Sequence, residues 1–396
     1  MIKILRVIHS LNPKVGGPPE GILQITPFLK KYGIETTVIC LDKVQSKWLD
    51  NKPYKVFALG RGFLKYGFQF NLVSKIKFIA EKHDLIIIHG LWQYHSLATF
   101  LALRKLKKKY FIFTHGMLDP WFEKRYPLKH FKKKIYWSLF EKKVIKSAEA
   151  VFFTSNNEEI YSRKWFRNLE IKKEIINYGI SKPPQDNQNL KKVFNQKYPF
   201  LNDKNVILFL SRVDYKKGIV LLIEAFGEIN KYYPELFLVI AGPYSNNLRL
   251  LSKLKYLIKK YDIEKKVIFT GMLEGDLKWG AFYTADFYCL PSHAENFGIV
   301  VAEALGCGSL MCISNKVNIY EEIEKAKAGI IANDTKKDTV RALKELLKLN
   351  EEEKIIMRKN ARELFDREFN LLNISSKFAN KLKDYLEKTT KNSNSL

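Results

Sequence analysis

The chain has 396 residues, of which 46% are hydrophobic and 28% are charged, so it is long enough for two globular domains and too apolar for a disordered chain. No apolar run reaches the roughly 18 residues of a membrane-spanning helix, and the first apolar run is interrupted too soon for a secretory signal. The formal net charge of +27 leaves nucleic acid, an anionic membrane and anionic small molecules open as partners, alongside a compositional bias with no partner. The four cysteines lack zinc-site spacing and lie in apolar segments, which predicts reduced thiols and a cytoplasmic protein.

The first half of the chain alternates short apolar runs, rich in β-branched residues, with helical patterns. This alternation is typical of a parallel α/β sheet. Helical periodicity is visible at 71–83 and 96–109. The predicted strands lie at 2–9, 36–41, 55–60, 84–90, 110–116 and 150–155.

The second half repeats this alternation after a segment that has no sustained periodicity. Residues 181–204 contain a proline pair and many polar side chains, so we interpret them as a linker. The sequence predicts two doubly wound, Rossmann-like α/β domains facing each other across a cleft, at 1–190 and 191–372. An amphipathic helix with a disordered tail should follow at 373–396. The predicted strands of the second half lie at 205–212, 236–243, 266–271, 287–292, 310–314 and 328–333.

Ligands of such sheets bind beyond the carboxyl ends of the strands, so the residues that follow each strand are the candidates. After the first predicted strand, Gly16 and Gly17 can bring backbone amides close to a phosphate, although an ordinary flexible turn has the same composition. Two later strands end at His89 and His115, each followed by a glycine and then by a tryptophan. For a histidine at the carboxyl end of a strand, a binding role and a structural role are about equally expected.

In the second half, Arg212 lies at the end of a predicted strand and Lys217 comes five residues later. Arginine offers a planar fork of donors and lysine a mobile point charge, and the two together suit a diphosphate. In a chain this rich in lysine, a solvated basic turn is the competing interpretation.

The stretch "HAENFGIVVAEALGCG", residues 293–308, places two glutamates in an otherwise apolar segment. A helix beginning at Gly298 would make the amides around Asn296, Phe297 and Gly298 an anion-attracting N-terminus. A buried carboxylate is costly unless it is paired or hydrogen-bonded, and the vicinal hydroxyls of a ribose would satisfy Glu303. With Glu295 on a sugar, the ordered set of residues predicts a nucleotide-sugar site.

Taken together, these motifs resemble the retaining glycosyltransferases of family 4, which have the two-domain GT-B fold. The resemblance covers nearly the whole chain. It rests on the Gly-Gly loop, "HGLWQY", "HGMLDPW", "SRVDYKKG", "VIFTGML" and "HAENFGIVVAEALGCG", the last being the E-x7-E motif of the family. The two histidine motifs are most similar to members that assemble polysaccharides.

The resemblance implies a role for each candidate residue. The closing helix would return to brace the first, acceptor-side domain, and the second domain would bind the donor. His115 would lie near the transferred sugar, and the catalytic set would be His115, Glu295, Arg212 and Lys217. The nucleotide-sugar would be held through Gly16, Gly17, Arg212, Lys217, Gly271, Asn296, Phe297, Gly298 and Glu303, with Glu295 on the sugar, Glu303 on the ribose and the two basic residues on the diphosphate.

The resemblance therefore implies a metal-independent retaining glycosyltransferase of cell-surface polysaccharide biosynthesis. Its donor would be a UDP- or GDP-linked sugar, its acceptor a glycan or a lipid-linked glycan, and it would need no cofactor and bind no nucleic acid. Two alternatives stay open. One is a basic nucleic-acid-binding protein, although the basic residues are scattered and no recognition motif is present. The other is a different GT-B-type enzyme, such as a sugar-nucleotide epimerase or a phosphorylase.

The densest basic segment suggests a peripheral membrane contact. Residues 101–150 contain fourteen Lys/Arg and four acidic residues. Within it, the charges of 127–148 are interleaved with apolar side chains, which favours contact with the anionic inner face of the plasma membrane. A core helix with a basic outer face is the competing interpretation. The apolar positions are Phe131, Ile135, Trp137, Leu139, Phe140 and Val144.

Overall fold

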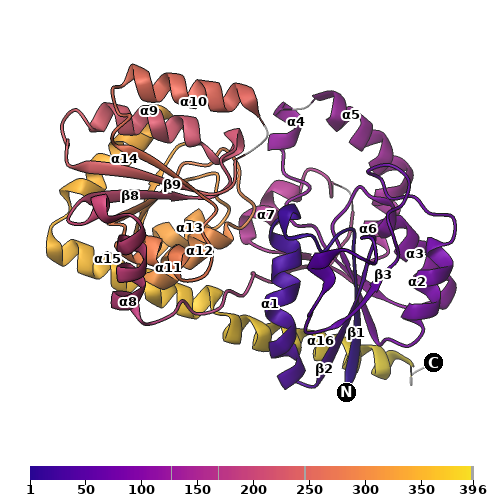
Figure 1. Ribbon diagram of the computed structural model, residues 1–396. Helices are drawn as coiled ribbons and strands as arrows, with labels where there is room; N and C mark the ends of the chain where they lie inside the picture. The colour runs from indigo at the N-terminus through magenta and orange to yellow at the C-terminus, as the bar shows by residue number, and fades with distance from the viewer. Residues whose placement is uncertain (126, 168, 245–246, 394–396) are drawn as a thin grey trace. The chain divides into compact units, whose positions relative to one another are not determined.

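The computed structural model describes residues 1–125, 127–167, 169–244 and 247–393, and the chain divides into two compact units (Figure 1). The first unit consists of Met1–Ser181 and Leu371–Leu396, and the second of Lys182–Asn370. Both ends of the chain therefore belong to the first unit.

The first unit contains a sheet of seven parallel strands among its described residues, in the order β3-β2-β1-β4-β5-β6-β7. Six of these strands lie where the sequence predicts one, and β7 is an unpredicted edge strand whose three residues are too few to give a pattern. The strands are β1 (Ile2–Ile8), β2 (Ile34–Cys40), β3 (Lys55–Ala58), β4 (Leu85–His89), β5 (Tyr110–Phe113), β6 (Ala150–Phe153) and β7 (Lys173–Ile175).

Helices cover both faces of this sheet because alternate strand residues point to opposite sides. Leu5 and Val7 of β1 pack with the apolar sides of α2 and α3. Ile4 packs on the other face, with α1 and α16. The described helices are α1 (Gly17–Lys31), α2 (Leu72–Ala80), α3 (Tyr94–Leu106), α4 (Trp121–Arg125), α5 (Pro127–Tyr136), α6 (Lys142–Lys146), α7 (Asn156–Ser162) and α16 (Leu371–Ser393).

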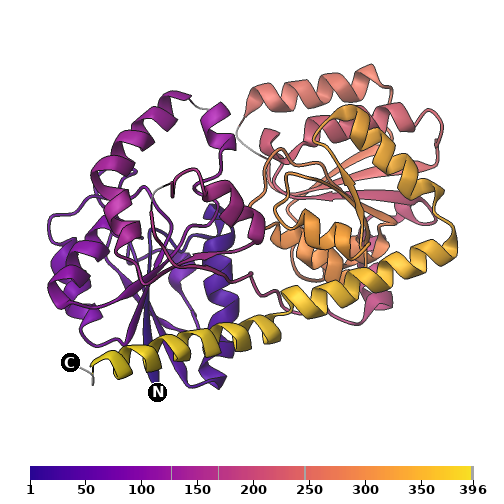
Figure 2. The same cartoon turned by 180° about the vertical axis from the view of Figure 1, so that it is seen from behind.

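Helix α16 is the predicted closing helix, and it packs on the first unit as expected (Figure 2). Ile374 and Phe378 are buried beside the core residues Phe113 and Phe152 of the sheet. The disordered tail expected from residue 389 is wrong in part, because α16 continues to Ser393. The last three residues lie outside the described part of the chain.

In the part of the second unit that the structure describes, six parallel strands form a sheet in the order β10-β9-β8-β11-β12-β13. All six lie where the sequence predicted a strand. Among its described residues, the strands are β8 (Asn205–Leu210), β9 (Leu236–Ala241), β10 (Val267–Gly271), β11 (Phe287–Leu290), β12 (Leu310–Ser314) and β13 (Ile330–Ala332). The helices are α8 (Asn187–Lys197), α9 (Ile219–Ile229), α10 (Leu248–Lys260), α11 (Gly275–Thr284), α12 (Ile299–Cys307), α13 (Tyr320–Lys325), α14 (Lys336–Lys348) and α15 (Glu351–Leu364).

Helix α8 corrects the interpretation of 181–204 as a linker. Asp186 caps the helix by accepting a hydrogen bond from the amide of Asn189, and Leu190 and Phe194 are buried one turn apart. Phe194 packs against Gly280 of α11, where a larger side chain would not fit. The helix escaped detection because it has only two apolar anchors. It places 182–190 in the second unit, so the unit boundary falls at 181 and not at 190.

Within the described residues, no helix is both long and apolar enough to cross a membrane.

Candidate functional site

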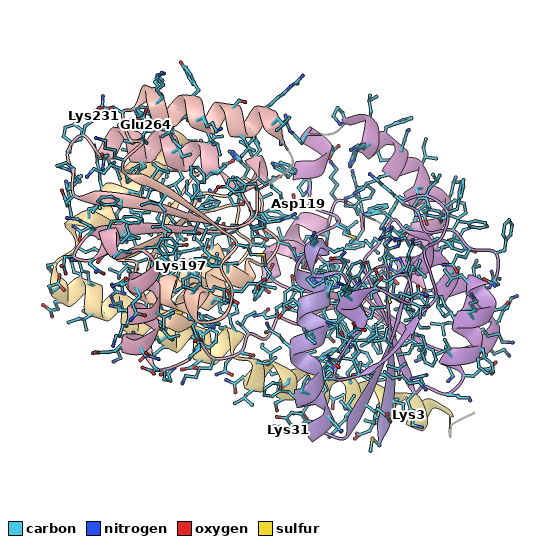
Figure 3. All side chains as sticks on the ribbon, in the orientation of Figure 1. Lys3, Lys31, Asp119, Lys197, Lys231 and Glu264 are labelled. Carbon is cyan, nitrogen blue, oxygen red and sulfur yellow. The ribbon has the colours of Figure 1, made fainter. Side chains whose placement is uncertain are left out.

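The order of each sheet defines one place for a ligand. The order in which successive strands are added to the sheet reverses between β1 and β4 in the first unit and between β8 and β11 in the second, and doubly wound sheets bind ligands beyond the carboxyl ends of the strands at such a point. In the first unit, Asp119 lies at this carboxyl edge, and Lys3 and Lys31 lie at the opposite edge (Figure 3). The predicted residues His89, His115, Arg212 and Glu295 all lie at the end of a strand or in the loop that follows it.

In the second unit, the loop after β8 and the loop after β11 are joined through backbone. The carbonyl oxygen of Lys216 accepts hydrogen bonds from the His293 amide at 2.8 Å and from the Ser292 hydroxyl at 3.0 Å. Gly218 has a φ of 70° and lies so close to Pro291 that an added Cβ would be 1.8 Å from its carbonyl oxygen. Only glycine fits there, so this glycine sets the distance between the two loops.

The joined loops bring Lys217 and Glu295 into an ion pair, although the sequence analysis had assigned them to different parts of a donor. Both are largely covered, Lys217 in the turn after β8 and Glu295 just before α12. Burial, followed by the charges of Lys216 and Arg212, lowers the pKa of Lys217. The contact with the Glu295 carboxylate opposes that shift because it stabilises the ammonium.

Arg212 is exposed, and no carboxylate among the described residues pairs with it. Its backbone is held by Gly242 at the end of β9, where a Cβ would lie 1.9 Å from the Ser211 oxygen. The side chain is close enough to Lys217 for their charges to interact. Arg212 and Lys217 therefore form a cationic pair at the carboxyl edge of the second sheet.

Glu303 lies inside α12 and is 6% exposed, as the sequence predicted for a carboxylate in a buried helix. Its partner was not foreseen: Lys278 of α11 approaches the carboxylate at 2.8 Å. Glu303 therefore does not need a ribose to compensate its burial. Lysines are abundant in the chain, and only the packing of α11 on α12 identifies this one.

The residues before α12 divide between core and surface. Gly298 caps the helix with a φ of 82°, and α12 begins at Ile299. Phe297 is buried and its ring packs edge-on against Phe369, so its side chain belongs to the core and only its backbone could meet a ligand. Asn296 is half-buried in the same turn. Gly271, at the end of β10, has a φ of 71° and open space around its α-carbon.

His293 is a candidate that the sequence analysis quoted but did not assign. Its Nδ1 lies 3.0 Å from the Asp334 carboxylate, and its ring stacks on Tyr215 at a centroid distance of 5.3 Å. Its backbone also joins the two loops. Only the register of β13 beside β12 brings Asp334 near it, so spacing along the chain could not reveal the pair.

In the first unit, the Gly-Gly segment is the start of a helix and not a loop. Gly16 caps α1 with a φ of 113°, and an added Cβ there would meet nothing within 4 Å. Pro18 and Pro19 in the first turn have no N–H, so the Gly17 amide is one of the few donors at this end of α1. The open surroundings suit the predicted approach of a phosphate.

The two predicted histidines are in contact. His89 Nδ1 lies 3.0 Å from His115 Nε2, and His115 Nδ1 lies 2.6 Å from the Tyr178 hydroxyl. At the far end, the guanidinium of Arg6 in β1 approaches His89 Nε2 at 3.2 Å. Both ring nitrogens of His115 are therefore engaged inside the unit.

The turn that carries His115 is fixed by Glu158, which the sequence did not reveal. His115 has a φ of 51°, a conformation that side chains rarely adopt. One Glu158 oxygen accepts from the Thr114 hydroxyl and the Gly116 amide, each at 2.5 Å, and the other accepts from Thr154. These hydrogen bonds to a buried carboxylate hold the strained turn in place.

Among the residues that the structure describes, no three His, Cys, Asp or Glu side chains are grouped to hold a metal ion.

Comparison with known proteins shows which family the chain resembles. A model for Glycosyltransferase Family 4 matches residues 15–181, and one for Glycosyl transferases group 1 matches residues 191–364. An uncharacterized glycosyltransferase from Methanocaldococcus jannaschii is 33% identical over 169 residues, 42% of each chain. The lipopolysaccharide 1,2-N-acetylglucosaminetransferase of Salmonella typhimurium is 26% identical over 213 residues, 52% of this chain and 53% of that one.

A solved structure extends the likeness to the whole fold. Anabaena HepE in complex with UDP and glucose is 17% identical, with a TM-score of 0.78 over 97% of this chain and 100% of that one. With family models on both units, this chain belongs to the group 1/family 4 glycosyltransferases and has the two-domain α/β GT-B fold.

The joined loops give the first prediction. Gly218→Ala should destabilise the second unit more than Gly271→Ala, although both replace a glycine of nearly equal φ, 70° and 71°. Each change introduces a left-handed alanine that costs about 1–2 kcal/mol. Only the first also forces a Cβ onto the Pro291 backbone, which should add about 1–3 kcal/mol. Urea unfolding of both variants measures the difference, and equal losses would contradict the described contact between the loops.

Proposed function

We propose that this chain transfers a sugar from a nucleotide-diphosphate sugar to a glycan or lipid-linked acceptor in cell-surface polysaccharide biosynthesis. The observation that carries the proposal is the joined pair of loops in the second unit, where two cations and a carboxylate meet at the switch point of a parallel sheet. A cationic pair beside a carboxylate suits a ligand that has a diphosphate next to a sugar.

In this proposal Arg212 and Lys217 bind the diphosphate, and Glu295 accepts from sugar hydroxyls. The ion pair keeps the Lys217 ammonium in one position before the donor arrives, so little reorganisation is needed. Glu303 accepts from the ribose hydroxyls while it stays paired with Lys278. Gly16 and Gly271 offer backbone next to open space.

The comparisons support the chemical class of the substrates. The solved relative was crystallised with UDP and glucose, and the Salmonella relative acts on lipopolysaccharide. By this analogy we propose a UDP- or GDP-linked donor and a glycolipid or oligosaccharide acceptor. A metal ion is not required, because the two cations take the place of one on the leaving diphosphate.

A donor screen followed by kinetics of variants tests this assignment. A cognate nucleotide-sugar at 100 times its dissociation constant should stabilise the protein by about 2.7 kcal/mol in a thermal-shift screen. With that donor, Arg212→Ala and Lys217→Ala should each lower turnover by about 10²–10³, because each removes a cation from the charge that develops on the diphosphate.

Lys255→Ala is the matched control, since Lys255 is an exposed lysine on α10 outside the joined loops. It should leave turnover unchanged. Near wild-type turnover of Arg212→Ala or Lys217→Ala at saturating donor would remove that residue from the diphosphate site.

We also propose that the sugar is transferred with retention at its anomeric carbon. Double displacement would need a carboxylate nucleophile with a second carboxyl group about 5–5.5 Å away. Glu295 and Glu303 are instead each paired with a lysine. We therefore expect the nucleotide to depart first, with the acceptor hydroxyl entering on the same face and giving its proton to the departing phosphate oxygen.

Proton NMR of the first-formed product, with a defined donor, tests the stereochemistry. An α-linked donor should give an α-linked product, read from the anomeric coupling before mutarotation or a second transfer. An inverted coupling would require an activated acceptor on the opposite face and would overturn this mechanism.

We further propose that the first unit docks on anionic membranes through 127–140. Four apolar side chains of this segment, Phe131, Ile135, Leu139 and Phe140, are exposed, which argues against a core helix with a basic outer face. Leu128 is also exposed, at 82%. Of the predicted apolar set, Val144 is buried in the core and Trp137 is half-buried. Lysines lie between the exposed side chains, and each adds about 1 kcal/mol near an anionic leaflet.

Sedimentation with vesicles tests this docking. The wild-type chain should pellet with phosphatidylcholine vesicles that contain phosphatidylglycerol and not with phosphatidylcholine alone, and salt should release it. Phe131→Ser with Ile135→Ser should reduce binding. Ile355→Ser with Ile356→Ser, two exposed side chains on α15, should not. Equal sedimentation with both kinds of vesicle at low salt would count against docking.

A further inference from the structure

Four side chains inside the first unit form one line of hydrogen bonds, from Arg6 through His89 and His115 to Tyr178. The four come from separate places in the chain: β1, the end of β4, the turn after β5 and the segment after β7. The rings of His89 and His115 are inclined by only 15°, and those of His115 and Tyr178 by 9°, so each bond runs close to the plane of its rings.

The chemistry of Arg6 fixes the direction of every hydrogen bond in this line. A guanidinium can only donate, so His89 Nε2 must accept and His89 carries its proton on Nδ1. That proton is donated to His115 Nε2, which must then be unprotonated. The proton of His115 therefore lies on Nδ1 and is donated to the Tyr178 oxygen. In this arrangement both imidazoles are neutral, and each has one defined tautomer.

We infer that Arg6 is a positioning residue which, acting through His89, holds His115 as an uncharged imidazole protonated on Nδ1. The inference rests on the proposed function for the ring's place beside the transferred sugar. The tautomer itself follows from contacts within the first unit alone.

The isolation of Arg6 strengthens the inference. Its side chain is 2% exposed, and within the described residues its guanidinium contacts His89 and no carboxylate. Its Nε and Nη2 have no hydrogen-bond partner, and the guanidinium lies over the Phe378 ring at 5.5 Å from the centroid. A buried cation without an anion opposes the addition of a second positive charge nearby. The positive charge of Arg6 and its hydrogen bond to His89 therefore both favour the neutral form of the two imidazoles.

The ionisable groups around His115 also favour the neutral ring. Burial, followed by the charge of Arg6, lowers the pKa of His115 to about 3. Burial likewise lowers the pKa of His89 well below its ordinary value, and Arg6, His115 and His95 add to this shift. The Glu158 carboxylate, whose charge reaches Tyr178, is occupied by Thr114, Gly116 and Thr154. The groups that face the line are Arg6 of β1, His9 after it, Tyr54 just before β3, His95 of α3, Glu158 of α7 and Tyr178.

An uncharged ring has a direct use in glycosyl transfer. Positive charge develops on the sugar as its bond to the leaving group breaks, because the transition state resembles an oxocarbenium ion. An imidazolium beside that sugar would repel the developing charge. Arg6 and His89 prevent this by keeping the His115 ring uncharged.

Nitrogen NMR of the full chain labelled with 15N-histidine tests the tautomer without donor or acceptor. His89→Gln and His115→Gln assign the signals. In the wild-type chain, long-range proton–nitrogen correlations should show His89 and His115 neutral, with the proton on Nδ1, from about pH 5 to pH 8. A proton on Nε2 of His115, or a doubly protonated ring at pH 6, would overturn the inference without the need for any variant of Arg6.

Variants of Arg6 test its part in the arrangement. Arg6→Met should free His89 Nε2, so that both tautomers of His115 are seen and its pKa moves toward the ordinary value. Arg6→Lys keeps a donor and a charge and should restore much of the single tautomer. Arg104→Met, the same change at an exposed site on α3, should leave the spectrum unchanged. A spectrum of Arg6→Met identical to that of the wild type would exclude the role of Arg6.

Kinetics separate a positioning role from general damage. With the donor found by the screen, Arg6→Met should lower kcat on the order of 10–100-fold, as expected for a misplaced group near the reacting atoms. The KM for donor should change little, because the proposed diphosphate contacts, Arg212 and Lys217, are not part of the line. If the tautomer is as inferred and no nucleotide-sugar binds, the proposed function fails and the positioning of His115 stands. A raised KM with unchanged kcat would contradict the positioning role.

Discussion

The backbone carbonyl of Lys216 is the contact on which the proposed donor site depends. It accepts from both His293 and Ser292, and so ties the loop after β8 to the loop after β11. Gly218 makes this approach possible, because any side chain would strike Pro291. Without the junction, Lys217 and Glu295 would be two charges on separate loops, and each would need its own compensation for burial.

In the first unit, side chains instead of backbone groups hold the candidate residues in place. Glu158 holds the strained turn at His115 by accepting hydrogen bonds from it. The His115 ring is oriented by its hydrogen bond to the neutral His89, which in turn accepts from the buried Arg6. In both units, polar groups therefore hold the loops at the carboxyl edge of a parallel sheet in fixed positions. This is where the topology leaves room for a ligand.

Much of the fold could be predicted from the sequence because buried parallel strands are written as short apolar runs. Each of the six strands described in the second unit has such a run. The burial of Glu303 could also be predicted, because this residue lies within an apolar helical segment. What escaped had no local signal. Helix α8 has two apolar anchors, β7 has three residues, and Lys278, Glu158 and Arg6 meet their partners only through tertiary packing. The pairing of Lys217 with Glu295 depends on two loops 78 positions apart in the chain.

The central claim is that the joined loops of the second unit bind a diphosphate. Calorimetric titration of the wild-type chain with the diphosphate and the monophosphate of the same nucleoside, for uridine and for guanosine, tests it most directly. The account predicts tighter binding of one diphosphate by at least about tenfold, or 1.4 kcal/mol, and the loss of that difference in Lys217→Ala. Equal affinity of mono- and diphosphate in the wild-type chain would contradict the assignment of Arg212 and Lys217.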